Sequence, residues 1–277
     1  MNDKLHFIYQ NDLVITEIKG DDFIDLFNRL STNNIPNQKN LITDSIFTNE
    51  NGRFIDIASV WNTSQHAFMI SNSLNHQDLL NWIDKFTFEE DISISNPLKK
   101  KVISIFSNNK NNNLNIFGEI NKNEIINRNV GGVEVIFAHT SFFNDYKIIN
   151  LILDDDPKNA ELIESYLNSQ DIFQIEESEF NSFRIKNRIP ICGNEIVSLY
   201  NPLEIGISHM IDFNKGCYVG QEVIARLDTY DKVQRKLMIL NNKKDFDIIS
   251  SKGCDVTTSD DEYCLAVVKK NIFSLGS

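Results

Sequence analysis

The stretch NKGCYVGQE, residues 214–222, decides how the fold of this 277-residue chain is interpreted. Gly216 and Gly220 flank its centre, and glycines so closely spaced indicate a backbone that bends sharply or that another group approaches closely. The residues that follow, up to Leu227, are good helix formers with apolar side chains on one side. The stretch therefore predicts a tight loop that leads into the N-terminus of a helix.

Cys217 has the most distinctive chemistry in this loop. A helix N-terminus carries partial positive charge and Lys215 lies nearby in the sequence, and both favour a thiolate over a thiol. We therefore treat Cys217 as a candidate catalytic thiol. The alternative is a small buried residue within a glycine turn, and the corresponding alternative for Lys215 is a solvated surface charge.

The composition excludes several classes of protein. A formal net charge of −12 and a pI near 4.9 argue against a basic nucleic-acid-binding face. The N-terminus lacks the order of charged and apolar residues found in a signal peptide, and the longest apolar run, residues 148–153, is far too short to span a bilayer. We therefore expect a cytoplasmic protein without direct nucleic-acid or membrane contacts.

The cysteines are too scattered to form a disulfide framework, and none belongs to a C-x-x-C pair, so reduced thiols are expected. Their spacing also argues against a self-contained zinc or iron–sulfur site, and no histidine has a partner at metal-ligand spacing. No residue is assigned as a metal ligand. The four cysteines are Cys192, Cys217, Cys254 and Cys264.

The order of strand-like and helix-like segments predicts an α+β fold. Alternating apolar patterns predict strands, and apolar residues at helical spacing predict helices. The expected strands lie within residues 7–20 (two strands), 41–47, 53–61, 66–71, 92–94, 102–106, 132–139 and 146–153, and the expected helices begin near residues 23, 75, 157 and 176. Loops or irregular chain are expected over 108–113, 188–196 and 201–206. Three short strands after residue 231 predict a small closing β unit, so the chain is divided into 1–228 and 229–277.

The segment KGCYVGQE resembles the signature K-G-C-[YF]-x-G-Q-E of the YgfZ family of folate-binding, iron–sulfur-related proteins, which includes a mitochondrial iron–sulfur assembly factor branch. Two further segments, GDDFIDLFNRL and LITDSIFTNENGRFID, are similar to the family's N-terminal helix and hairpin motifs. The resemblance covers most of the chain. The signature positions that match are Lys215, Gly216, Cys217, Tyr218, Gly220, Gln221 and Glu222.

This resemblance implies the fold of the wider superfamily that contains the glycine-cleavage T-protein: interleaved α+β subdomains followed by a small C-terminal β-barrel-like unit. The chain departs from the family at Arg188, where a glycine is usual, and at residues 229–231, which replace an H-R-G-like element. The β unit after the signature is also short for the family.

The resemblance implies tetrahydrofolate as the cofactor. A folate pocket needs apolar walls for the pterin, a polar group facing it, and cations for the glutamate tail. Arg184, Lys215 and Arg226 are the expected cations, and Tyr218 and Gln221 are expected either to contact the ligand or to stabilise the loop. Glu195 and Glu204 are weaker candidates for the folate pocket, because such glutamates are more often solvated.

Alignment with the T-protein implies a catalytic role for Asp56, while its place in an alternating strand also fits, and favours, a position on the polar face. The leading expectation is a tetrahydrofolate-binding accessory protein for iron–sulfur cluster assembly or repair. It would act with iron–sulfur assembly proteins or client enzymes, including those that modify tRNA. The alternatives are a folate-dependent aminomethyltransferase of the T-protein type and a structural scaffold with a vestigial pocket.

Overall fold

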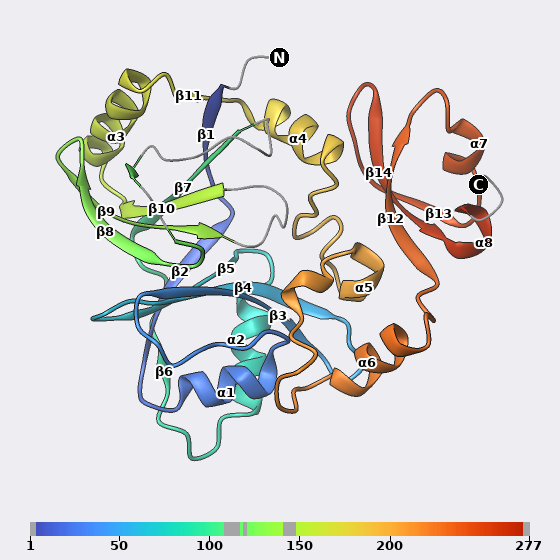
Figure 1. The fold of residues 1–277 in the computed structure, drawn as a ribbon, viewed down its shortest axis with the longest axis horizontal. Coiled ribbons are helices and arrows are strands. Elements are labelled where there is room, and N and C mark those ends of the chain that lie inside the picture. The colour runs from blue at the N-terminus through green and yellow to red at the C-terminus, as the bar shows by residue number, and fades with distance from the viewer. Residues whose placement is uncertain (1–3, 108–116, 119–120, 141–147, 274–277) are drawn as a thin grey trace.

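The computed structural model describes residues 4–107, 117–118, 121–140 and 148–273. The described strands form three sheets, with helices on their outer faces (Figure 1). The predicted α+β fold is confirmed. The predicted loop over residues 108–113 lies outside the described residues.

The five-stranded sheet is built from strands in the N-terminal third of the chain, between residues 13 and 94. In spatial order its strands are β3 (Leu41–Thr48), β4 (Phe54–Asn62), β5 (Ala67–Asn72), β2 (Leu13–Lys19) and β6 (Ser93–Ile94). The predicted hairpin joins β3 to β4, and Gly52 has φ +65°, which a glycine adopts without strain. The helices α1 (Phe23–Leu30) and α2 (His76–Lys85) cover the face of this sheet that points away from the six-stranded sheet (Figure 1).

The six-stranded sheet takes its strands from widely separated parts of the chain. In spatial order they are β11 (Phe173–Gln174), β1 (Leu5–Tyr9), β7 (Lys100–Ser107), β10 (Ile148–Asp154), β9 (Val133–Thr140) and β8 (Ile125–Val130). The helix α3 (Pro157–Ser169) packs on its outer face, and Asp156 caps α3 by accepting a 2.8 Å hydrogen bond from the Lys158 backbone N–H. Successive strands β1 and β2 belong to different sheets, so the two sheets are interleaved along the chain.

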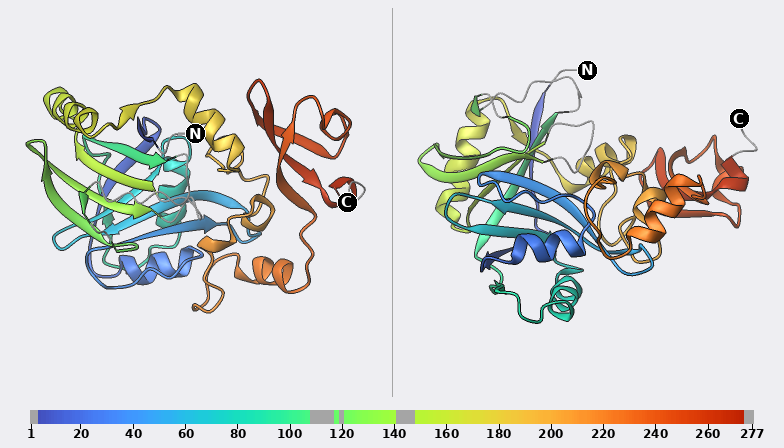
Figure 2. Two further views of the ribbon diagram at one scale, coloured as in Figure 1. Left: turned by 45° about the horizontal axis from the view of Figure 1, so that its top comes forward. Right: turned by 60° about the horizontal axis from the view of Figure 1, so that its bottom comes forward.

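The two large sheets pack against each other through an apolar layer that includes Ile15, Trp61 and Ile152. The helix α4 (Glu177–Lys186) then leads the chain towards the third sheet, and the two further views show this sheet at one end of the molecule (Figure 2). Shorter helical segments follow α4: α5 (Pro202–Ile205), the 3₁₀ helix η2 (Ser208–Met210) and α6 (Gln221–Thr229).

The C-terminal sheet has three antiparallel strands in the order β12 (Arg235–Asn241), β14 (Tyr263–Lys269) and β13 (Cys254–Ser259). The helices α7 (Phe246–Ile249) and α8 (Lys270–Phe273) lie beside it. All three predicted C-terminal strands are present. Within the described residues they form an open sheet, so the expected barrel-like closure is not observed.

Candidate functional site

A cavity of about 940 Å³ lies between the five-stranded and six-stranded sheets. On one side it is lined by Asp44, Ser59 and Ile70, which are paired across β3, β4 and β5. On the other side it is lined by Ser104 and Asn150, which are paired across β7 and β10. Its volume falls in the range of small-molecule and cofactor sites.

The polar side chains of the cavity wall are held by hydrogen bonds to one another. Gln10 Nε2 donates to Ser104 Oγ at 3.0 Å, and Ser104 Oγ donates to Asn150 Oδ1 at 2.7 Å. Because Asn150 uses its oxygen as the acceptor, its amide nitrogen is left as a donor. Between the two walls, Thr140 Oγ1 from β9 donates to Asp44 Oδ2 from β3 at 2.7 Å. The wall therefore combines an amide donor with a carboxylate acceptor.

Arg184 also lines this cavity, and it is buried at 1% exposure. Its Nη1 lies 3.2 Å from Glu195 Oε2, and burial lowers the pKa of the guanidinium. Glu195 is 0% exposed and accepts hydrogen bonds from the hydroxyls of Thr257 (2.5 Å) and Thr258 (2.7 Å) in β13. The expectation that Glu195 is solvated is therefore wrong. Arg184 Nη2 has no hydrogen-bond partner within the part of the chain that the structure describes.

Asp56 lies directly behind the cavity wall and is fully buried. Its Oδ2 accepts a hydrogen bond from the Asn72 backbone N–H at 3.1 Å, and its Oδ1 accepts one from Cys192 Sγ at 3.4 Å. Burial raises the pKa of Asp56 to about 6 and also raises the pKa of the Cys192 thiol. Both Asn72 and Cys192 line the cavity, so Asp56 is connected to the cavity by its hydrogen bonds to these two residues. The polar-surface interpretation of Asp56 is wrong.

The signature loop does not line this cavity; it docks on the opposite side of the five-stranded sheet, where α1 ends. Lys215 Nζ donates to the backbone oxygens of Ser31 (2.9 Å) and Asn33 (2.5 Å) and to Asn28 Oδ1 (3.2 Å). Burial lowers the pKa of Lys215 to about 8, with Asp212 acting in the opposite direction. The solvated alternative for Lys215 is thus wrong, and its ammonium fastens the loop to the segment after α1.

The same loop is fastened to the β3–β4 hairpin. Thr48 Oγ1 donates to the Val219 carbonyl at 2.8 Å, and the Val219 N–H donates to the Arg29 carbonyl at 3.0 Å. Gly220 has φ +86°, and a Cβ added there would lie 2.5 Å from the Asn49 carbonyl oxygen. Gly220 is therefore required both by its backbone angle and by the close approach of the hairpin. The predicted sharp bend is confirmed.

The other predicted residues of the loop differ in exposure. Tyr218 is buried at 7% exposure below the Lys215 ammonium, which lies 5.6 Å from its ring centroid, and burial raises its pKa to about 12. Gln221 begins α6, and Arg226 lies on the exposed side of α6, where it pairs with Glu222 at 3.1 Å. Cys217 is exposed, so the small buried alternative for this cysteine is wrong.

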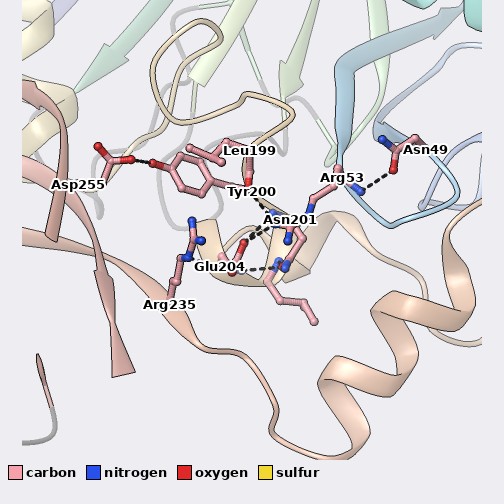
Figure 3. A network of polar contacts seen from close by, with 9 residues as sticks. Asn49, Arg53, Leu199, Tyr200, Asn201, Glu204, Arg235 and Asp255 are labelled. Atoms are coloured by element: carbon pink, nitrogen blue, oxygen red, sulfur yellow. Dashed lines mark hydrogen bonds and ion pairs between the residues drawn. The ribbon is translucent and has the colours of Figure 1, made fainter. Parts of the chain in front are cut away.

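A second polar network joins the hairpin to the C-terminal sheet (Figure 3). Arg53 Nη1 lies 2.9 Å from both Glu204 Oε2 and the Leu199 carbonyl oxygen, and Glu204 is 5% exposed, contrary to the expected solvated position. Arg235 from β12 approaches the other oxygen of Glu204 at 4.0 Å, and Tyr200 hydrogen-bonds Asp255 in β13. Glu204 and Tyr200 therefore link the hairpin residue Arg53 and the segment before α5 to the C-terminal sheet.

Comparison with known proteins agrees with this geometry. The structure superposes on that of the glycine cleavage system aminomethyltransferase T from Bartonella henselae with a TM-score of 0.72, covering 97% of this chain and 79% of that one at 10% sequence identity. The protein therefore has the fold of the glycine-cleavage T-protein, as the sequence predicted. No protein-family model matches the sequence.

The curated relatives that match by sequence include a plant protein and a bacterial enzyme. A chloroplastic protein of Arabidopsis thaliana with a provisional name as a transferase is 26% identical over 207 residues, which cover 72% of this chain and 47% of that protein. The aminomethyltransferase of Thermotoga maritima is 26% identical over 234 residues, which cover 80% of this chain and 63% of that enzyme. The chain thus spans less than two thirds of the length of either relative.

Two further features of the described residues bear on other kinds of site. No group of at least three histidine, cysteine, aspartate or glutamate side chains is arranged there to hold a metal ion. Likewise, none of the helices in the described ranges has the length and apolar character needed to cross a membrane.

Proposed function

We propose that the protein binds a reduced folate in the cavity between the two large sheets and acts as an accessory protein for iron–sulfur cluster assembly or repair. The observation that supports folate binding is the arrangement of the cavity wall, where Ser104 and Gln10 orient Asn150 opposite Asp44. The fold, shared with an aminomethyltransferase of the glycine cleavage system, supports the same proposal.

The residues of the cavity fit the pterin part of a folate. A pterin is flat, and it carries ring N–H and amino donors beside acceptor nitrogens and an oxygen. The Asp44 carboxylate suits the donors and the Asn150 amide suits the acceptors, while Ile57, Ile70 and Phe180 supply apolar walls. Bound tetrahydrofolate would supply ring nitrogens that carry a one-carbon unit. The chain's own residues would bind the ring and exclude water from it.

Binding of 5-formyltetrahydrofolate, measured by titration calorimetry, tests this half of the proposal. Asn150→Leu should weaken binding by about tenfold or more, because it removes the amide and leaves the Ser104 hydroxyl without its acceptor. Arg226→Ala should leave binding unchanged, since Arg226 lies on exposed α6 outside the cavity. Failure of the wild-type protein to bind any reduced folate at millimolar concentration would remove the proposal.

The second half concerns Cys217. The signature loop is fastened to α1 and to the hairpin by Lys215, Val219 and Gly220, yet it leaves the Cys217 side chain exposed. An exposed thiol on a firmly held loop suits transient contact with iron–sulfur assembly proteins or client enzymes, including those that modify tRNA. We place these contacts in the cytoplasm.

Cells that lack the endogenous protein and depend on it for iron–sulfur enzyme activity test this role. Cys217→Ala should fold like the wild type and fail to restore the activity. Cys254→Ala changes a half-buried thiol of the C-terminal sheet and is the matched control, expected to restore it. Full rescue by Cys217→Ala would refute a function for this thiol.

A folate-dependent aminomethyltransferase is the second candidate, and Asp56 is the observation that favours it. The Asp56 carboxyl is buried and is separated from the cavity by Asn72 and Cys192, which line it. Its pKa of about 6 gives it the proton affinity of a general base near neutral pH. Incubation with tetrahydrofolate and an aminomethyl-lipoyl carrier should then yield methylenetetrahydrofolate, and Asp56→Asn should abolish it. Absence of product above background with the wild-type protein would exclude this candidate.

A further inference from the structure

The charged groups that line the cavity are mostly acidic. Among the described residues, two cations line it, Lys101 and Arg184, against five carboxylates. The five carboxylates belong to Asp12, Asp44, Glu164, Glu176 and Glu177. The cavity therefore carries an excess of negative charge even before any ligand enters.

Both cations of the lining are already paired. Arg184 Nη1 lies 3.2 Å from the buried Glu195 carboxylate, so this pair is neutral as a whole. Lys101 Nζ lies 3.0 Å from Asp155 Oδ1, and the ammonium is 5.7 Å from the ring centroid of Tyr9. Within the described residues Arg184 Nη2 still has a free N–H, but because both cations already face a carboxylate, neither adds net positive charge for an anionic ligand.

The outer part of the cavity is the most acidic. The charged lining residues that are exposed are Asp12, in the turn between β1 and β2, and Glu176 and Glu177, at the start of α4. A ligand with its ring between the sheets would direct its outer end towards these groups. Like charges within one Debye length repel, and the repulsion weakens as salt is added.

Two of the three predicted tail-binding cations, Lys215 and Arg226, lie outside the cavity lining, and only Arg184 belongs to it. Lys215 is bound to backbone oxygens after α1, and Arg226 pairs with Glu222 on α6. A folate tail carries two carboxylates, and each further glutamate adds another. The cavity thus provides hydrogen-bonding groups for a pterin ring and no matching charge for a long anionic tail.

From these observations we infer that the cavity selects reduced pterins with a short or absent glutamate tail and discriminates against polyglutamylated folates. This inference rests on the proposed reduced-folate site and specifies its ligand class. It follows from the sign of the charge at the outer lining, where Glu176 and Glu177 are the decisive residues.

The test is calorimetric binding of three probes: 6-methyltetrahydropterin, 5-formyltetrahydrofolate with one glutamate, and its pentaglutamate. At low ionic strength the pentaglutamate should bind about tenfold more weakly than the monoglutamate, and the difference should shrink in 0.5 M salt, where the Debye length is about 4 Å. The double variant E176Q/E177Q should recover most of the lost pentaglutamate affinity and leave the affinity for 6-methyltetrahydropterin unchanged.

The double variant D78N/E89Q is the matched control. It removes the same charge from exposed positions in α2 and in the loop after it, outside the cavity lining, so the discrimination should persist. Pentaglutamate binding as tight as or tighter than monoglutamate binding would overturn the inference while leaving the folate proposal intact. If none of the three probes binds, both the inference and the proposed folate site fail.

Discussion

Arg184 and Glu195 form an ion pair, Nη1 to Oε2 3.2 Å, in which both side chains are almost completely buried. The pair joins α4 to the C-terminal sheet, because Glu195 also accepts hydrogen bonds from Thr257 and Thr258. The Glu195 carboxylate thus holds the cavity-lining Arg184 and, at the same time, anchors β13.

Replacing Glu195 by alanine should destabilise the protein by about 3–5 kcal/mol, because it leaves a buried guanidinium without its partner. Urea denaturation at 25 °C measures this change. Glu222→Ala is the control: it breaks the exposed Arg226–Glu222 pair, and its effect should stay within about 1 kcal/mol. Equal effects of the two substitutions would show that burial of the Arg184–Glu195 pair does not increase the loss of stability when the pair is broken.

Gly220→Ala should be far more destabilising than Gly206→Ala. Both glycines have similar backbone angles, φ +86° and φ +81°, so both substitutions carry the same left-handed strain, about 1–2 kcal/mol. A Cβ at Gly220 would also meet the Asn49 carbonyl oxygen at 2.5 Å, whereas nothing lies within 4 Å of one at Gly206. Thermal denaturation of the two variants compares them, and similar melting temperatures would contradict the close docking of the hairpin.

Lys215→Met should cost about 1–3 kcal/mol, because it leaves the Ser31 and Asn33 carbonyl oxygens without their shared donor. The measurement is the free energy of unfolding in urea. Lys232→Met, at an exposed lysine 5.3 Å above the Tyr230 ring, is expected to change it by no more than about 0.5 kcal/mol. A neutral Lys215→Met variant would mean that the loop is held without this ammonium.

Asp56 should make the stability depend on pH between its unfolded pKa of 3.8 and its folded pKa of about 6. Its pKa in the folded protein is about 6, above the ordinary 3.8, so its protonated form is favoured by folding. The stability it contributes is present below pH 3.8 and is lost as the pH rises through 6, because the folded state then holds more protons than the unfolded one.

Raising the pH from 5 to 7.5 should therefore lower the unfolding free energy of the wild type by about 1.4 kcal/mol relative to Asp56→Asn. Urea denaturation of both proteins at the two pH values gives the difference. A parallel pH dependence of the two proteins would show that Asp56 is ionised throughout this range.

The elements of the fold could largely be predicted from the sequence because their apolar spacing is regular. Phe23, Leu26, Phe27 and Leu30 define α1, and all four are buried. The sequence did not predict β8, because the exposed Asn127, Arg128 and Asn129 interrupt its apolar pattern. The helix α5 was expected to be irregular chain, since four residues are too few for a periodic signal, and its Asn201 cap precedes a proline.

The candidate site was predicted less completely, because it is assembled by tertiary contacts. Cys192 and Asp44 were not identified, although Asp44 left a signal as the single carboxylate within the apolar run LITDSIF. The sequence also gave no indication that Lys215 contacts backbone oxygens far from the cavity. Only the interleaving of the sheets decides which polar residues meet.

The position of β1 between β7 and β11 has a consequence for synthesis on the ribosome. Leu5–Tyr9 leaves the exit tunnel well before its partners at residues 100–107 and 173–174. At typical elongation rates the nascent chain displays this apolar strand with at least one edge unpaired for roughly 10–30 s before the second partner is made. Productive folding in the cell should therefore depend on holdase chaperones that shield β1 during translation.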